Sequence, residues 1–192
     1  FGPAAFQKRK DGRMTLGAQM LFVPHIVGAW LNSRAWTRKL NAADLVIPGL
    51  LLGRLPRYTD LDRLGIAAIV DLSAEMPCPS GGRDYVSIPM LDLIPPQAEQ
   101  LEAAVQAIQT AYASQALHAT HVAQGSVLVC CALGFSRSAL SVAAWLLASG
   151  KAASPENAID IVRQARPAIV LGDDHREALR VWWSHHQNRS VE

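Results

Sequence analysis

From residue 43 onward, short apolar runs alternate with longer stretches in which apolar residues recur every three or four positions. The runs are rich in Val, Ile and Leu and are bounded by Pro, Gly or Ser, as buried strands usually are. The longer stretches have the spacing of helices with one apolar face. The pattern predicts strands at 45–47, 50–53, 66–72, 85–90 and 126–130, and helices at 59–65, 95–117, 138–150, 154–166 and 173–186.

Local signals mark the ends of several of these helices. Thr59 is a predicted N-cap and Gly65 a predicted stop for the first helix. Pro95 and Pro96 are expected at the start of the second. Strands interspersed with helices indicate an α/β fold, with a central mixed or parallel sheet flanked by helices. We assign this domain to residues 43–192 and expect residues 1–42 to form an N-terminal helical extension.

The extension encloses an apolar segment, Leu16–Leu31, that Pro24 and His25 interrupt. Its sixteen residues fall short of the roughly 20 that a membrane-spanning helix needs. Trp30 and Trp36, with Arg and Lys nearby, suit a membrane interface. Two interpretations remain open: residues 1–40 contact a membrane, or the helix packs on the domain or on a partner.

The overall charge of +2 conceals an asymmetry. Residues 1–40 contain seven Lys and Arg against one Asp, which is +6, and the remainder contains eleven against fifteen acidic residues, which is −4. The basic stretch Lys8–Arg13 is too short, and too poor in aromatic residues, to predict nucleic-acid binding. Three cysteines argue against a disulfide framework and for a reducing, cytoplasmic compartment. No residues have the spacing of a metal site, so we expect neither metal nor cofactor.

The candidate chemistry lies in the stretch CALGFSRS, residues 131–138. A strand precedes it and a helix follows, so Cys131–Arg137 forms a loop at a helix N-terminus, where backbone N–H groups and the helix dipole favour an anion. Gly134 lets the backbone curl around that anion, and Arg137 can bind two phosphate oxygens at once. The same positive field would stabilise a thiolate at Cys131, which predicts phosphoryl transfer to sulfur.

This stretch resembles the Cys-x5-Arg-Ser/Thr signature of the protein tyrosine phosphatase superfamily, in particular the small dual-specificity phosphatases. The resemblance extends over roughly residues 43–187. It implies that Cys131 attacks phosphorus, that Arg137 binds the phosphate, and that the hydroxyl of Ser138 helps the thiolate leave. It also implies a substrate-binding cradle, made by the backbone of Ala132, Leu133, Gly134, Phe135 and Ser136.

Such an enzyme also needs a general acid for the leaving oxygen. The family places an aspartate on a loop after a strand, some 30–40 residues before the cysteine. Asp92 follows the predicted strand 85–90 and fits this position, whereas Asp84 precedes that strand and Asp71 ends another. The competing interpretation of Asp92 is a helix-capping or loop carboxylate.

One position departs from the family, which usually has histidine before the nucleophile where this chain has Cys130. A thiol is a weaker hydrogen-bonding group, so the cradle would be held differently. Because strand side chains alternate, Cys130 and Cys131 should point to opposite faces, with Cys130 a small buried residue. A redox pairing of Cys131 with Cys130 or Cys78 is an alternative.

The sequence therefore predicts hydrolysis of phosphate monoesters through a cysteinyl-phosphate intermediate. A non-catalytic phosphate-binding module and a rhodanese-like sulfur or arsenate enzyme are the competing hypotheses. The uncharged cradle favours a singly phosphorylated protein residue. The N-terminal segment instead favours a phospholipid, because its layout is similar to bacterial fusions in which a phosphatidic-acid-phosphatase-like membrane region precedes such a domain. The initial Phe1 fits a piece of such a longer protein at the cytoplasmic face of the membrane.

Overall fold

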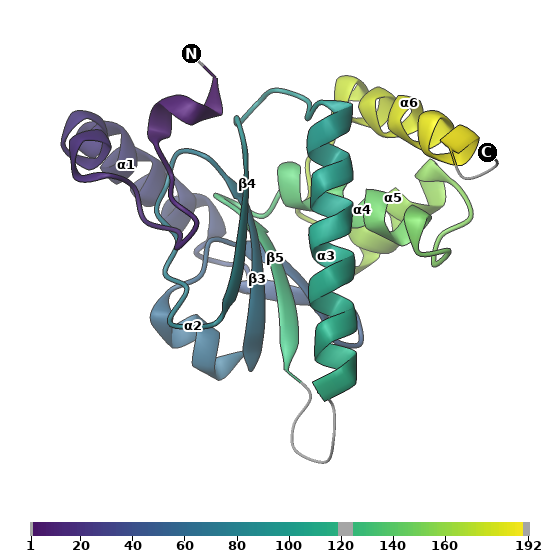
Figure 1. Ribbon diagram of the computed structural model, residues 1–192, viewed down its shortest axis with the longest axis horizontal. Coiled ribbons are helices and arrows are strands. Elements are labelled where there is room, and N and C mark those ends of the chain that lie inside the picture. The colour runs from purple at the N-terminus through teal and green to yellow at the C-terminus, as the bar shows by residue number, and fades with distance from the viewer. Residues whose placement is uncertain (1, 119–124, 190–192) are drawn as a thin grey trace.

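The computed structural model describes residues 2–118 and 125–189. A five-stranded sheet forms its centre, in the order β1-β2-β5-β3-β4 (Figure 1). Strands β2, β5, β3 and β4 run parallel, and β1 pairs antiparallel with β2 at one edge. The strands are β1 (Ala43–Ile47), β2 (Leu50–Arg54), β3 (Ile66–Ser73), β4 (Asp84–Met90) and β5 (Ser126–Cys131).

Helices cover both faces of the sheet, which confirms the predicted α/β fold with a mixed sheet. One face packs against the four helices α3 to α6, and the other against α2 and the N-terminal region. The helices are the 3-10 turn η1 (Pro3–Phe6), α1 (Leu16–Thr37), α2 (Tyr58–Arg63), α3 (Ala98–His118), α4 (Arg137–Ala148), α5 (Pro155–Ala165) and α6 (Asp173–Arg189).

The period of two along β5 divides its side chains between two hydrophobic cores. Val127, Val129 and Cys131 belong to the larger core beneath α3 and α4. Leu128 and Cys130 belong to the smaller core on the opposite face. Cys130 is fully buried there, as the alternation predicts.

Two predicted helix starts are wrong. Helix α2 begins at Tyr58, with Arg57 as its N-cap, so Thr59 lies inside the helix. The backbone N–H of Arg57 bonds the buried carboxylate of Asp60 at 3.0 Å, and this contact starts the helix two residues earlier than the threonine signal suggests. Helix α3 begins at Ala98, so Pro95 and Pro96 precede it instead of forming its first turn.

The N-terminal region folds against the domain. Helix α1 starts after an N-cap hydroxyl at Thr15 and continues past Pro24 to Thr37. Before it, the Nζ of Lys8 is fully buried and lies 2.5 Å from the Asp71 carboxylate at the end of β3. Among the described residues, no helix has the length and hydropathy needed to cross a bilayer.

The Lys8–Asp71 pair generates a prediction about stability. Lys8→Ala leaves the buried Asp71 carboxylate without its cation, which should lower the free energy of unfolding by about 3 kcal/mol. Urea denaturation followed by circular dichroism measures the change. Lys10→Ala removes an exposed lysine from the same segment and should change stability by less than about 0.5 kcal/mol. Equal effects of the two substitutions would show that Lys8 does not fasten this segment.

Candidate active site

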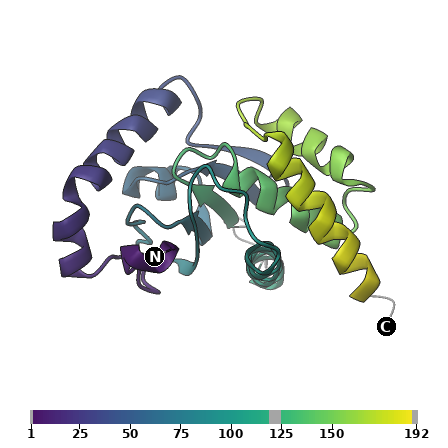
Figure 2. The ribbon, with the colours of Figure 1, turned by 90° about the horizontal axis from the view of Figure 1, so that it is seen from above.

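The loop between β5 and α4 places Cys131 at the carboxyl edge of the sheet, where loops from several elements meet. Seen from above, α1 and α6 lie on opposite sides of these loops (Figure 2). The Cys131 Sγ accepts a hydrogen bond from the Gly134 N–H at 3.3 Å and lies 3.3 Å from the Ser138 hydroxyl.

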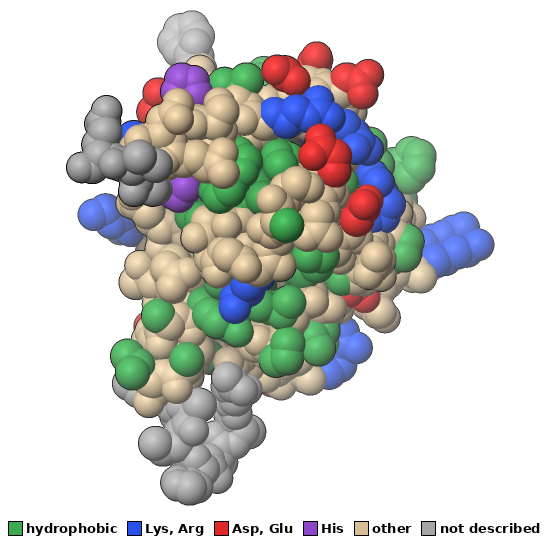
Figure 3. Space-filling view, turned by 90° about the vertical axis from the view of Figure 1, so that its right-hand side faces the viewer, with side chains coloured by type: hydrophobic (Ala, Val, Ile, Leu, Met, Phe, Trp, Pro, Cys, Tyr) green, Lys and Arg blue, Asp and Glu red, His purple; other side chains and the backbone are tan. Residues whose placement is uncertain are grey.

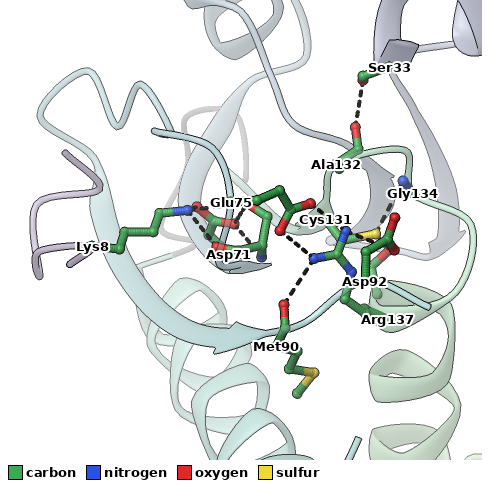
Figure 4. A network of polar contacts seen from close by, with 12 residues as sticks. Lys8, Ser33, Asp71, Glu75, Met90, Asp92, Cys131, Ala132, Gly134 and Arg137 are labelled. Atoms are coloured by element: carbon green, nitrogen blue, oxygen red, sulfur yellow. Dashed lines mark hydrogen bonds and ion pairs between the residues drawn. The ribbon is translucent and has the colours of Figure 1, made fainter. Parts of the chain in front are cut away.

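The carbonyl groups of the loop point outward; those of residues 132–135 are held by donors from other parts of the chain, and that of Ser136 by the first turn of α4. The Ser33 hydroxyl of α1 donates to the Ala132 carbonyl at 2.6 Å (Figure 4). Ser33 is 1% exposed, so water does not compete for this bond. The N-terminal helix therefore contributes directly to the shape of the loop.

Arg166, at the end of α5, holds the next two carbonyls. Its Nε donates to Gly134 at 3.0 Å, and its Nη2 donates to Leu133 at 3.4 Å. Asp44 on β1 fixes the same guanidinium from the other side at 2.5 Å. Arg166 is 1% exposed, so all its polar contacts lie inside the protein.

Backbone donors complete the set. The Val170 N–H bonds the Phe135 carbonyl at 3.0 Å, and the Leu140 N–H bonds the Ser136 carbonyl at 2.8 Å. In a trans peptide, the carbonyl and the following N–H point in opposite directions. Five outward carbonyls at 132–136 therefore direct the N–H groups of residues 133–137 inward, which makes the cradle that an oxyanion needs.

Gly134 is required for two structural reasons. Its φ is +73°, a left-handed conformation that side chains with a Cβ rarely adopt. A Cβ would also lie 2.4 Å from the Gly53 carbonyl carbon of β2. The sequence predicted curvature at Gly134, and the structure adds the close contact with β2.

Arg137 is buried and is held in position from one end. Its two terminal nitrogens donate to Glu75 at 2.7 and 2.8 Å, and Nη1 also donates to the Met90 carbonyl at 3.0 Å. Burial alone would lower the pKa of Arg137, but the Glu75 hydrogen bonds, with the charges of Cys131 and Asp92, raise it above its ordinary value. The guanidinium is a permanent cation beside the sulfur.

The other edge of this guanidinium is available for an anion. The Arg137 Nε is buried and has no hydrogen-bond partner among the described residues. Nη2 lies on the same edge, with one Asp92 carboxylate oxygen 3.1 Å away. Two parallel N–H groups on one guanidinium edge match two oxygens of a phosphate.

Glu75 was missed by the sequence analysis. It is 7% exposed and follows β3 by two residues. Burial by itself raises the pKa of Glu75, but hydrogen bonds from Arg137 outweigh this and hold the pKa below its usual value. A single glutamate after a buried strand was the only sequence signal, and it did not indicate which arginine Glu75 would meet.

Asp92 lies in the loop between β4 and α3 and is close to the cysteine and the arginine (Figure 4). Its side chain is 41% exposed, so it can approach a bound substrate. Asp71 is instead buried against Lys8, and Asp84 is exposed at the start of β4. The structure thus brings Asp92 together with Cys131 and Arg137 and keeps the other two aspartates apart from them.

Cys130 and Cys78 contact each other on the sheet face opposite Cys131. Burial, the hydrogen bond with Cys78 and the nearby Asp71 raise the pKa of Cys130 well above its ordinary value. All three thiols are free. This arrangement argues against a pairing of Cys131 with either of the other two.

Two cavities open on either side of Asp92, and Leu133 lines both. The first measures about 520 Å³ and is lined by Phe6, His25, Gly28, Ala29, Asn32, Glu75, Leu91, Asp92, Ile94, Ala132 and Leu133. The second measures about 820 Å³ and is lined by Trp36, Asp92, Leu93, Leu133, Phe135, Ser136, Val170, Gly172, Asp173, Asp174 and His175.

Within the described residues, no three His, Cys, Asp or Glu side chains are grouped as a metal site requires.

Comparisons with known proteins agree with this geometry. The family model of the dual specificity phosphatase catalytic domain matches residues 52–185. No curated protein sequence matches significantly. The structure of PTPMT1 in complex with PI(5)P is similar, with a TM-score of 0.65, 23% identity, and coverage of 78% of this chain and 99% of that chain.

Two further solved structures have the same fold. Human DUSP28 matches with a TM-score of 0.64 and 25% identity over 77% of this chain and 97% of its own. Tk-PTP in its active form matches with a TM-score of 0.62 and 24% identity over 74% and 97%. The chain therefore belongs to the dual specificity phosphatases, cysteine-dependent hydrolases that cleave phosphate monoesters through a cysteinyl-phosphate.

Proposed function

We propose that Cys131, Asp92, Arg137 and Ser138 carry out the two chemical steps. In the first, the Cys131 thiolate forms a bond to phosphorus while the bond from phosphorus to the leaving oxygen breaks. A protonated Asp92 gives its proton to that oxygen. Arg137 and the inward N–H groups bind the three non-bridging oxygens as charge shifts towards the leaving group.

In the second step, water attacks phosphorus and the sulfur–phosphorus bond breaks. Asp92 accepts the proton from water, so it returns to the state required for the next cycle. The Ser138 hydroxyl, 3.3 Å from sulfur, donates to the departing thiolate. Inorganic phosphate then leaves.

We propose that the substrate carries one phosphate next to an apolar or aromatic group, as phosphotyrosine in a protein does. The carrying observation is the lining of the two cavities, which includes neither lysine nor arginine among the described residues. Asp173 and Asp174 add negative charge to one cavity. Within the described residues, the lining of these two cavities thus offers no lysine or arginine to a second phosphate.

A singly phosphorylated phospholipid is the second candidate. It is favoured by large apolar side chains exposed around the cavities, since Trp36 is 69%, Leu93 88%, Ile94 54% and Val170 63% exposed. The +6 charge of residues 1–40 also favours contact with an anionic membrane. On this proposal the domain works at a cytoplasmic membrane face, as part of a longer protein.

A substrate panel tests the proposal. We expect the chain to hydrolyse para-nitrophenyl phosphate and a phosphotyrosine peptide, with kcat/KM at least about tenfold above that for a phosphatidylinositol bisphosphate, because the cleft lacks extra cations. Cys131→Ser should lower kcat more than about a thousandfold and retain peptide binding. An inactive wild-type chain that still binds phosphopeptide would instead show a non-catalytic module.

Asp92 should act through leaving-group protonation. Asp92→Asn should slow hydrolysis of alkyl phosphates about a hundredfold or more, but slow para-nitrophenyl phosphate much less, because nitrophenolate leaves without a proton. Asp174→Asn removes the same charge from the same cavity and should leave that ratio unchanged. Equal slowing of both substrates by Asp92→Asn would assign the acid role to another residue.

Ser33 should position the cradle without touching substrate. Ser33→Ala leaves the Ala132 carbonyl unpaired, which should weaken vanadate binding and lower kcat/KM by about tenfold. Thr37→Val is the matched control, since the buried Thr37 hydroxyl bonds only the Ser33 carbonyl of its own helix, at 2.6 Å. It should lower the melting temperature similarly while retaining vanadate affinity. Equal loss of vanadate affinity in both variants would reduce the role of Ser33 to stability.

A further inference from the structure

Helix α1 presents an apolar stripe to solvent. Leu16, Met20, Val23, Val27 and Trp30 follow one another at intervals of four, three, four and three residues, which keeps them on one side of the helix. Their exposed fractions are 75, 77, 50, 51 and 45%. We call these five residues the α1 stripe.

The stripe faces away from the active site. His25, Gly28 and Asn32 line the catalytic cavity, and Ser33 is buried against the loop. At 100° per residue, the middle of the stripe lies roughly opposite the cavity-lining side of the helix. The helix therefore has one side that serves the catalytic cleft and another that is largely exposed, with Val27 and Trp30 partly covered by the domain at its C-terminal end.

Arginines gather at the C-terminal end of the stripe. The guanidinium groups of Arg34 and Arg57 lie 5.6 and 5.9 Å from the centre of the Trp30 ring. Besides burial, the positive charges of Arg54 and Arg57 both lower the pKa of Arg34. Asp60 is the carboxylate that faces this cluster, and it already pairs with Arg54 at 3.0 Å. Three cations against one anion leave this end of the helix positive.

Arg34 has unused hydrogen-bonding capacity. Its Nη2 donates to the Leu55 carbonyl at 3.2 Å, but Nε and Nη1 are buried without a partner in the described part of the chain. Burial and the neighbouring Arg54 and Arg57 lower the pKa of Arg34 to about 10. Because these nitrogens are buried, Arg34 does not reach a lipid directly, but it is still charged at neutral pH and adds to the positive potential at this end of the helix.

A small apolar cavity lies beside the same end of the stripe. It measures about 180 Å³ and is lined by Ile26, Val27, Trp30, Leu55, Met76 and Pro77. The cavity and the exposed Arg57 thus lie at the same end of the stripe, next to Trp30. Its aromatic residue lies between the apolar part and the charged part, as at a membrane interface.

We propose that the α1 stripe and the Arg34, Arg54 and Arg57 cluster dock the phosphatase on an anionic lipid surface. The apolar side chains enter the acyl boundary and the exposed Arg57 binds lipid phosphates, while the less exposed Arg34 and Arg54 add positive charge behind it. Further cations flank the helix, with Arg9, Lys10 and Arg13 before it and Arg38 and Lys39 after it, against the single acidic residue Asp11. This charge favours an anionic surface over a second, equally basic copy of the helix.

The face formed by α5 and α6 provides a contrast. It carries acidic and basic side chains next to each other (Figure 3). There Arg180 pairs with Glu156 at 2.9 Å and with Glu177 at 3.4 Å. Such a neutralised surface offers no attraction to anionic lipid, so docking is expected at α1 alone.

This surface is where we locate the membrane contact proposed above. Its docking does not depend on which substrate the enzyme cleaves. The experiment is co-sedimentation of the wild-type chain with vesicles of phosphatidylcholine, with and without phosphatidylglycerol. We expect binding to the anionic vesicles that falls as salt increases. Met20→Glu with Val27→Glu should weaken it about tenfold or more, and Arg57→Gln about fivefold.

The control Leu117→Glu with Val181→Glu makes the same charge change at exposed apolar positions on α3 and α6, and should bind less than about threefold more weakly than wild type. Because that control carries the same two added charges, equal loss in both double variants would overturn the proposal. The proposal would also be overturned if the wild-type chain did not bind anionic vesicles but formed a dimer that is lost in the variant with Met20→Glu and Val27→Glu. Wild-type turnover of para-nitrophenyl phosphate, measured in parallel, reports separately on the proposed catalytic function.

Discussion

The active site depends on one backbone constraint: five successive carbonyls must turn away from the sulfur so that five N–H groups can turn towards it. Only the Ser136 carbonyl is satisfied by the helix that follows it, so the carbonyls of residues 132–135 each need a donor from elsewhere in the chain. Ser33, Arg166 and the Val170 N–H supply these four contacts from distant parts of the chain. The anion cradle is therefore a tertiary structure, although its residues are adjacent in sequence.

The same constraint explains why helix α1 belongs with the catalytic unit. Its buried Ser33 holds the loop, and neighbouring positions form one wall of the catalytic cavity. Lys8 anchors the preceding segment through a buried ion pair at the end of β3. A helix held this firmly cannot shift against the domain without disturbing the loop. Any partner that contacts its outer side would therefore act on an element that also shapes the active site.

Arg137 shows how charge is arranged around the sulfur. Glu75 binds one end of the guanidinium with two hydrogen bonds and so orients the opposite edge, which carries Nε and one hydrogen of Nη2. Asp92 approaches that edge from a more exposed loop. The buried carboxylate thus orients the guanidinium, and the more accessible one is free for the proton transfer that we propose.

Sequence alone determined the α/β order, the alternation that separates Cys130 from Cys131, and the loop from Cys131 to Arg137, because these depend on local period and on residues adjacent in the chain. It identified Asp92 through a resemblance. It did not identify Glu75, Ser33 or Arg166, which lie 62, 99 and 32–33 positions from their partners. Contacts at such separations leave no periodic trace, so only the packing of α1, α5 and the β3 edge around one loop decided them.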